Sequence, residues 1–134
     1  FDSDKELDGV PFPYVKKFNR VTGKEEVVYM PIGDFEIRAT EFSHPNLGDD
    51  RVIAGYFFVA NGKTTAYPER IRLLAFDPSS KYAYYCKVQF TMRGNAHFTI
   101  DDFCTIVSDI SSELIPDIMT CLPDWVEITE LETN

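Results

Sequence analysis

The ten residues 51–60, RVIAGYFFVA, limit the fold of this chain more than any other stretch. They are apolar at odd and even positions alike, so a strand here must be covered on both faces and must lie at the centre of a sheet. Asn61-Gly62 follows directly and supplies the positive φ angles of a type I′ turn. We therefore expect a central strand that returns through residues 63–67 until Pro68, which cannot donate a ladder hydrogen bond.

Other segments alternate apolar and polar residues as half-buried strands do. Residues 13–19 and 27–32 predict an edge strand and its returning partner around a turn at Gly23. In residues 35–42, one face carries Phe35, Ile37 and Ala39, and the other carries Glu36, Arg38 and Thr40. In residues 82–91, the core face is expected to carry Tyr82, Tyr84, Cys86, Val88 and Phe90.

Between these strands, residues 43–50 and 77–80 are rich in turn-forming residues and predict loops. Pro68 suits the first turn of a helix, so residues 69–76 predict either a short helix or a strand.

The last third predicts a long amphipathic helix. Thr99 followed by Asp102 fits an N-cap with a capping box. Pro116 predicts a kink or break, and Pro123 predicts the end of the helix. Residues 124–134 are expected to form a final strand or extended tail, with Trp125 held against the body. The apolar stripe consists of Phe103, Val107, Ile110, Leu114, Ile118 and Cys121.

Together these segments predict the α+β class: an antiparallel sheet of about five or six strands packed by one long C-terminal helix. A length of 134 residues suits one domain. We expect this single α+β domain over residues 13–134, preceded by a flexible acidic segment at 1–12.

Charge excludes several partners. The 22 acidic and 13 basic residues give a net charge of −9, and Lys16-Lys17 is the one adjacent basic pair. A nucleic acid or an anionic membrane surface would repel such a chain on average. The longest apolar run, residues 52–60, is far below the ~20 residues of a membrane helix. The chain begins at Phe1 rather than Met, which leaves room for a leader or membrane anchor before it.

The candidates for chemistry are few. Three isolated cysteines, an odd number with no C-x-x-C pair, suit core packing better than a disulfide framework or a zinc site. A nucleophile would need Cys86 or Cys104 beside His97. Asp101 and Asp102 suit the start of a helix. The sequence contains no phosphate-binding loop or metal motif, so no catalytic residue, metal or cofactor is assigned.

The surplus of aromatic residues on the predicted strands points to a contact surface, because tyrosine suits interfaces with one apolar and one wet side. On a strand, Arg70 and Arg72 would share a face and could bind a carboxylate or phosphate, whereas on a helix they would diverge. An ordinary ion pair is the simpler role for them in so acidic a chain. The residues proposed for binding are Tyr56, Tyr67, Arg70, Arg72 and Tyr85.

Three segments together resemble the exosortase-associated proteins of the exopolysaccharide-biosynthesis accessory family. They are YFFVANGKTTAYPERIR at 56–72, YAYYCKVQF at 82–90 and DFCTIVSDISSELIPDIMTCLPDW at 102–125. The similarity covers roughly residues 51–125. The family's usual segment with Pro and Cys before the hairpin is replaced here by EFSHPNLGDD at 41–50, so no functional residue is carried over.

The resemblance implies a non-catalytic accessory domain of an exosortase or exopolysaccharide production and export system, acting through protein or polysaccharide contacts in the cell envelope. Its expected location is the periplasm or the outer face of the cytoplasmic membrane, with the cytoplasm as the alternative. Two other functions stay open: a small-molecule carrier with its ligand between helix and sheet, and a hydrolase or transferase that depends on cysteine and histidine.

Overall fold

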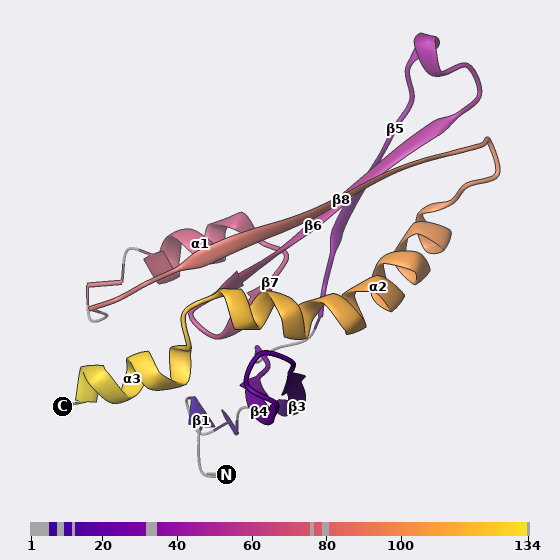
Figure 1. Ribbon diagram of the computed structural model, residues 1–134. Coiled ribbons are helices and arrows are strands. Elements are labelled where there is room, and N and C mark those ends of the chain that lie inside the picture. The colour runs from indigo at the N-terminus through magenta and orange to yellow at the C-terminus, as the bar shows by residue number, and fades with distance from the viewer. Residues whose placement is uncertain are drawn as a thin grey trace.

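The computed structural model describes residues 6–7, 10–11, 13–31, 35–75, 77–78 and 81–133. The chain is α+β, with antiparallel sheets followed by a long helix (Figure 1). In chain order the elements are β1 (Glu6–Leu7), β2 (Val10–Pro11), β3 (Tyr14–Asn19), β4 (Lys24–Tyr29), β5 (Arg38–Phe42), a 3-10 turn (Pro45–Leu47), β6 (Arg51–Ala60), β7 (Lys63–Thr65), α1 (Pro68–Ala75), β8 (Tyr85–Gly94), α2 (Ile100–Cys121) and α3 (Trp125–Thr133).

Strand β6 is the centre of a four-stranded sheet, as its apolar sequence predicts. β8 pairs with its full length on one side, from Arg51 opposite Gly94 to Ala60 opposite Tyr85. On the other side β5 pairs with its first half and β7 with its last three residues. The turn between β6 and β7 has positive φ at both Asn61 (49°) and Gly62 (76°), which confirms the predicted hairpin.

The predicted single sheet of five or six strands is wrong. β3 and β4 form the expected hairpin around Gly23, but they pair only with each other, and β1 pairs with β2 in a third, very short ladder. The β3–β4 hairpin is polar or exposed along most of its length, so it has little apolar surface to add to the main sheet. The β1–β2 ladder lies within residues 1–12, the segment that was expected to be flexible.

The remaining loops agree with the sequence over the residues that are described. Residues 43–50 hold the 3-10 turn, and the open choice for the segment after Pro68 is resolved in favour of helix α1. Of the predicted turn at 77–80, residues 79–80 lie outside the described residues.

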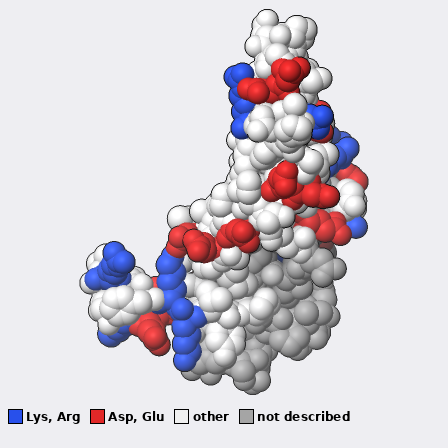
Figure 2. Space-filling view, turned by 90° about the vertical axis from the view of Figure 1, so that its right-hand side faces the viewer, with Lys and Arg blue, Asp and Glu red and all other residues white. Residues whose placement is uncertain are grey.

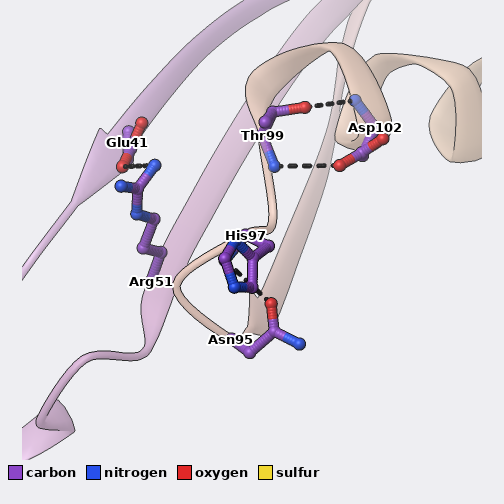
Figure 3. Close-up of polar contacts among 6 residues, drawn as sticks. All are labelled: Glu41, Arg51, Asn95, His97, Thr99 and Asp102. Carbon is purple, nitrogen blue, oxygen red and sulfur yellow. Dashed lines mark hydrogen bonds and ion pairs between the residues drawn. The ribbon is translucent and has the colours of Figure 1, made fainter.

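Helix α2 begins with the predicted capping box. The Thr99 hydroxyl accepts from the Asp102 N–H, and the Asp102 carboxylate accepts from the Thr99 N–H, both at 3.1 Å (Figure 3). The helix runs through Pro116 to Cys121, so the predicted break is absent, and it ends before Pro123 as expected.

The buried stripe of α2 differs in part from the predicted one. Phe103, Val107 and Ser111 are its buried residues, whereas Ile110 is 42% exposed and Cys121 is exposed. The stripe follows steps of four residues from Phe103, and Ile110, one residue before Ser111, points about 100° away from it. A small polar residue therefore occupies a core position that sequence pattern alone gives to an isoleucine.

The prediction for residues 124–134 is wrong, because residues 125–133 form helix α3. Asp124 caps it: its side chain accepts hydrogen bonds from the N–H groups of Val126 (3.0 Å) and Glu127 (3.4 Å). Trp125 and Val126 are buried and pack against Tyr29 and Tyr84, so the expected anchoring of Trp125 is confirmed.

The main sheet has two unlike faces. On the inner face, Ile53 packs against Phe103 and Val107 of α2, and Phe57 forms a T-shaped pair with Phe35, with ring centres 4.9 Å apart. On the outer face, α1 covers one end, where Ile71 packs against Phe58 and Ala60. No helix in the described part of the chain combines the length and the hydropathy needed to cross a bilayer.

Candidate functional site

The outer face of the main sheet carries four basic residues on its strands. The pairing registers place Arg38, Lys87 and Arg93 on it, together with Lys63. The described strand positions of this face include no acidic residue. In a chain with a net charge of −9, such a face is an exception.

Tyr56 lies at the middle of this face. Arg38 is its neighbour on β5 and Gln89 its neighbour on β8. The Lys87 ammonium lies 4.6 Å from the centre of the Tyr56 ring, and Phe58 contacts the same tyrosine in a T-shaped pair at 5.5 Å. Because Lys87 covers the ring, this position presents a cation to solvent rather than a bare aromatic surface.

A second pair of this kind lies beside the first. The Arg70 guanidinium sits 4.7 Å from the centre of the Tyr67 ring, and Tyr67 and Arg38 line one shallow hollow together with Glu36. Helix α1 holds Arg70 here because its Ile71 is buried against β6. We call Arg38, Tyr56, Tyr67, Arg70 and Lys87 the basic–aromatic face.

Three of the five residues proposed from sequence thus come together: Tyr56, Tyr67 and Arg70. Tyr85 is 63% exposed on the same side of the sheet, but it pairs with Ala60, four residues along β6 from Tyr56. That offset is about 13 Å along a strand. Arg72 is exposed on α1, two residues beyond Arg70, and helical geometry turns it to another side.

Sequence reasoning missed Arg38, Lys87 and Arg93. The sequence contained a signal for Arg38 and Lys87. Alternation along each strand places Arg38 on the face away from Ile37, and places Lys87 on the face of its strand that is more exposed to solvent. The missing information was the register, which brings β5 and β8 to the two sides of β6 with these side chains on one face.

The opposite side of the molecule has the reverse charge. Residues 98–134, which include α2 and α3, contain nine acidic residues and no lysine or arginine, so they carry the whole net charge of the chain. Figure 2 looks toward the N-terminal end of α2 and shows mainly acidic side chains across the middle of the described surface. Helix α2 on the inner face is therefore acidic, with Lys17 of β3 paired to its Asp117, whereas the strand positions of the outer face carry the cations.

The cysteines and histidines are not arranged as a nucleophilic site. Cys86 is the second residue of β8 and His97 lies three residues beyond its last residue, Gly94, so about 26 Å of strand runs between Cys86 and the turn that carries His97. His97 is exposed, and its backbone N–H donates to the side-chain oxygen of Asn95 at 2.9 Å (Figure 3). Cys104 packs into the inner-face cluster. Within the described residues, no cysteine is hydrogen-bonded to a histidine, and no group of three potential metal ligands is found.

His44 has a structural role instead. Its Nδ1 accepts from the Asn46 N–H at 3.1 Å and caps the 3-10 turn.

The cavities are small or shallow. One of about 220 Å³ lies between β4, the 61–62 turn and the α2–α3 junction, with Trp125 in its wall. That volume is below the roughly 300–1,000 Å³ of ordinary ligand pockets. A more open hollow of about 610 Å³ lies beside α2, and its lining includes Phe35, Ile37 and Cys104. At the centre of the interface between α2 and the sheet, Ile53, Phe57, Phe103 and Val107 are each fully buried, so side chains leave no room there for the ligand of a carrier.

Tyr84 closes the same end of the molecule. Its hydroxyl oxygen accepts from the Gly62 N–H at 3.1 Å, and its own N–H donates to the Asn61 side chain at 3.0 Å. Burial raises the pKa of the Tyr84 hydroxyl, against an opposing effect of the Gly62 hydrogen bond. Tyr84 also contacts Trp125, with ring centres 5.9 Å apart, and so ties the hairpin turn to α3.

Comparisons with protein-family models, with curated proteins and with solved structures return no match to this chain.

Proposed function

We propose that this chain is a non-catalytic binding domain that contacts an anionic partner through the basic–aromatic face. The observation that carries the proposal is the charge of the outer face: its described strand positions hold Arg38, Lys87 and Arg93 and no acidic residue, in a chain of net charge −9. The nearby carboxylate of Asp50, which pairs with Arg93, belongs to the loop before β6. Long cations that serve only solubility are usually interspersed with carboxylates. Here they are gathered beside tyrosines, as at recognition surfaces.

Three further observations favour binding over the two alternatives. The centre of the interface between α2 and the sheet is filled, which disfavours a carrier with its ligand there. Cys86 and His97 lie at opposite ends of β8, which disfavours that pair as a nucleophile and base. Cys104 is part of a packed apolar cluster. The resemblance to exosortase-associated proteins adds a setting to test, in which the anionic partner belongs to an exopolysaccharide system of the cell envelope.

The test is a binding measurement with two anionic polymers, polyglutamate and a polyuronate, over a range of salt concentrations. Arg38→Gln/Lys87→Gln should weaken binding about tenfold, because two exposed ionic contacts together contribute about 1.4 kcal/mol. The matched control is Lys16→Gln/Lys24→Gln, which removes two exposed charges from the β3–β4 hairpin and so has the same net charge as the first double variant. Its affinity should stay within about twofold of that of the parent chain. Equal losses in both double variants, or no binding by the parent chain, would refute the proposal.

A further inference from the structure

The outer edge of β8 is the longest open strand edge in the described structure. β8 pairs with β6 over ten consecutive residues without a bulge, and no described strand pairs with its other side. Such an edge offers a row of backbone N–H and C=O groups, which proteins usually protect with prolines, bulges or short length. β8 has none of these three, and its one protection is the charge of Lys87 and Arg93, since charged side chains also guard strand edges.

The charges of β8 select against a second copy of the same strand. Lys87 and Arg93 are its only charged residues, and both are exposed on the outer face. Two copies of β8 side by side would bring four cations together with no carboxylate on either strand, and like charges on paired strands are destabilising.

We propose that β8 receives an acidic polypeptide segment of a partner protein, which adds to the sheet as an extended strand. This inference rests on the proposed function and specifies its partner. Only a polypeptide can pair with the open backbone groups in register, and acidic side chains on the added strand would lie beside Lys87 and Arg93. Because these two residues are six apart on one face, the segment needs carboxylates at that same spacing.

Asp50 competes with the partner at one of these positions. Its carboxylate lies 3.0 Å from Nε of Arg93, and both side chains are largely exposed. The ion pair is therefore weak and open to exchange with a carboxylate of the partner. Replacing Asp50 by Asn frees Arg93 without changing β8 itself.

The experiment uses a ten-residue peptide of alternating valine and glutamate, which places carboxylates six residues apart. Three matched ligands accompany it: the glutamine analogue, the same acidic peptide with alternate backbone nitrogens methylated, and a soluble polyuronate. Affinity is measured by calorimetry, and hydrogen exchange reports the protection of the β8 amides.

The acidic peptide should bind and slow exchange at the outward amides of β8. Methylation of the peptide backbone should weaken binding at least tenfold, because it removes the hydrogen bonds of the ladder. The Lys87→Gln/Arg93→Gln variant of the protein should also weaken binding at least tenfold, because it removes the charge pairing. Asp50→Asn should tighten it about two- to threefold, the range expected for loss of one exposed competing ion pair.

The outcomes separate this inference from the proposed function. If the methylated peptide and the polyuronate bind as well as the acidic peptide and β8 exchange is unchanged, charge alone drives binding: strand addition is refuted while the proposed function stands. If neither the peptide nor the polyuronate binds, both fail. A dimer in sedimentation whose β8 amides are protected without peptide would identify the occupant as a second copy and overturn the inference.

Discussion

The two faces of the four-stranded sheet are built from the same strands and differ in nearly everything else. Residues of β6 at 53, 55, 57 and 59 are buried on the inner face, where Ile53 and Gly55 lie against Phe103 of α2. Those at 52, 54 and 56 on the outer face remain partly exposed, and α1 covers only the end near Phe58 and Ala60. A strand that is apolar on both sides has therefore been covered fully on one side and in part on the other.

This difference shows which residues folding explains. On the inner face, each side chain contributes buried apolar area, at roughly 25 cal/mol per Å². On the outer face, Arg38, Lys87 and Arg93 gain little stability from their positions, because exposed charges contribute at most about 1 kcal/mol each. Their presence on one face requires a different reason, and the proposed anionic partner supplies it.

The largest expected effect tests the inner face. Phe103→Ala should lower the free energy of unfolding by about 3–5 kcal/mol, because it removes a fully buried ring between α2 and β6. Ile106→Ala on the same helix is the control, and it should cost less than about 1 kcal/mol because Ile106 is 40% exposed. Urea unfolding of both variants measures the difference. Similar losses would mean that α2 does not seal the sheet as described.

A second test adds volume instead of removing it. A Cβ on Gly55 would lie 2.7 Å from Cε1 of Phe103 and 2.9 Å from Cγ2 of Ile37. Gly55→Ala should therefore cost about 1–3 kcal/mol through overpacking. Its neighbour Ala54 points to the outer face, where Ala54→Val should change stability by less than about 0.5 kcal/mol. If Ala54→Val were as costly as Gly55→Ala, the outer face would be closed rather than open.

How far the sequence predicts each face depends on the range of the interactions involved. The inner face follows from local pattern, since β6, its Asn61-Gly62 turn and the Thr99 cap are specified by neighbouring residues. Helix α3 was predictable too: Asp124 is an ordinary N-cap, but the preceding Pro123 made the segment read as an extended end. The buried Ser111 was not predictable, because only the contact with the sheet fixes which side of α2 is covered.

The outer face needs information that no single segment contains. Tyr56, Tyr67 and Arg70 were proposed from composition alone, and their approach depends on α1 packing against β6. Arg38 and Lys87 join them only through the pairing of β5 and β8 with β6. The separation of the β3–β4 hairpin from the main sheet likewise depends on long-range pairing. The propensities of the residues predict which segments form strands, but they do not predict which strands pair.

A smaller effect concerns the link between the hairpin turn and α3. Tyr84→Phe should cost about 0.5–1.5 kcal/mol at neutral pH, because the Gly62 N–H loses its acceptor. Burial raises the pKa of Tyr84, so its contribution is complete below about pH 10, the usual tyrosine pKa, and is lost as the pH rises further, when the unfolded state releases the proton more readily.

Unfolding of the parent chain and of Tyr84→Phe between pH 8 and 11 measures this alkaline loss, which should be smaller in the variant. Tyr85→Phe is the matched control: Tyr85 is 63% exposed, so the variant should keep the full decline of the parent. An identical decline in Tyr84→Phe and the parent would show that other groups govern alkaline stability.

The smallest expected effect on stability is also the one that most sharpens the contrast between the faces. Lys87→Gln removes an exposed cation from the Tyr56 ring, an interaction of about 0.5–1 kcal/mol at most. Urea unfolding should thus shift little, while affinity for an anionic polymer should fall severalfold. A residue whose loss leaves folding intact but weakens binding is placed for a partner and not for the core. If Lys87→Gln instead destabilised the chain by several kcal/mol, the outer face would be structural, and the distinction between the two faces would fail.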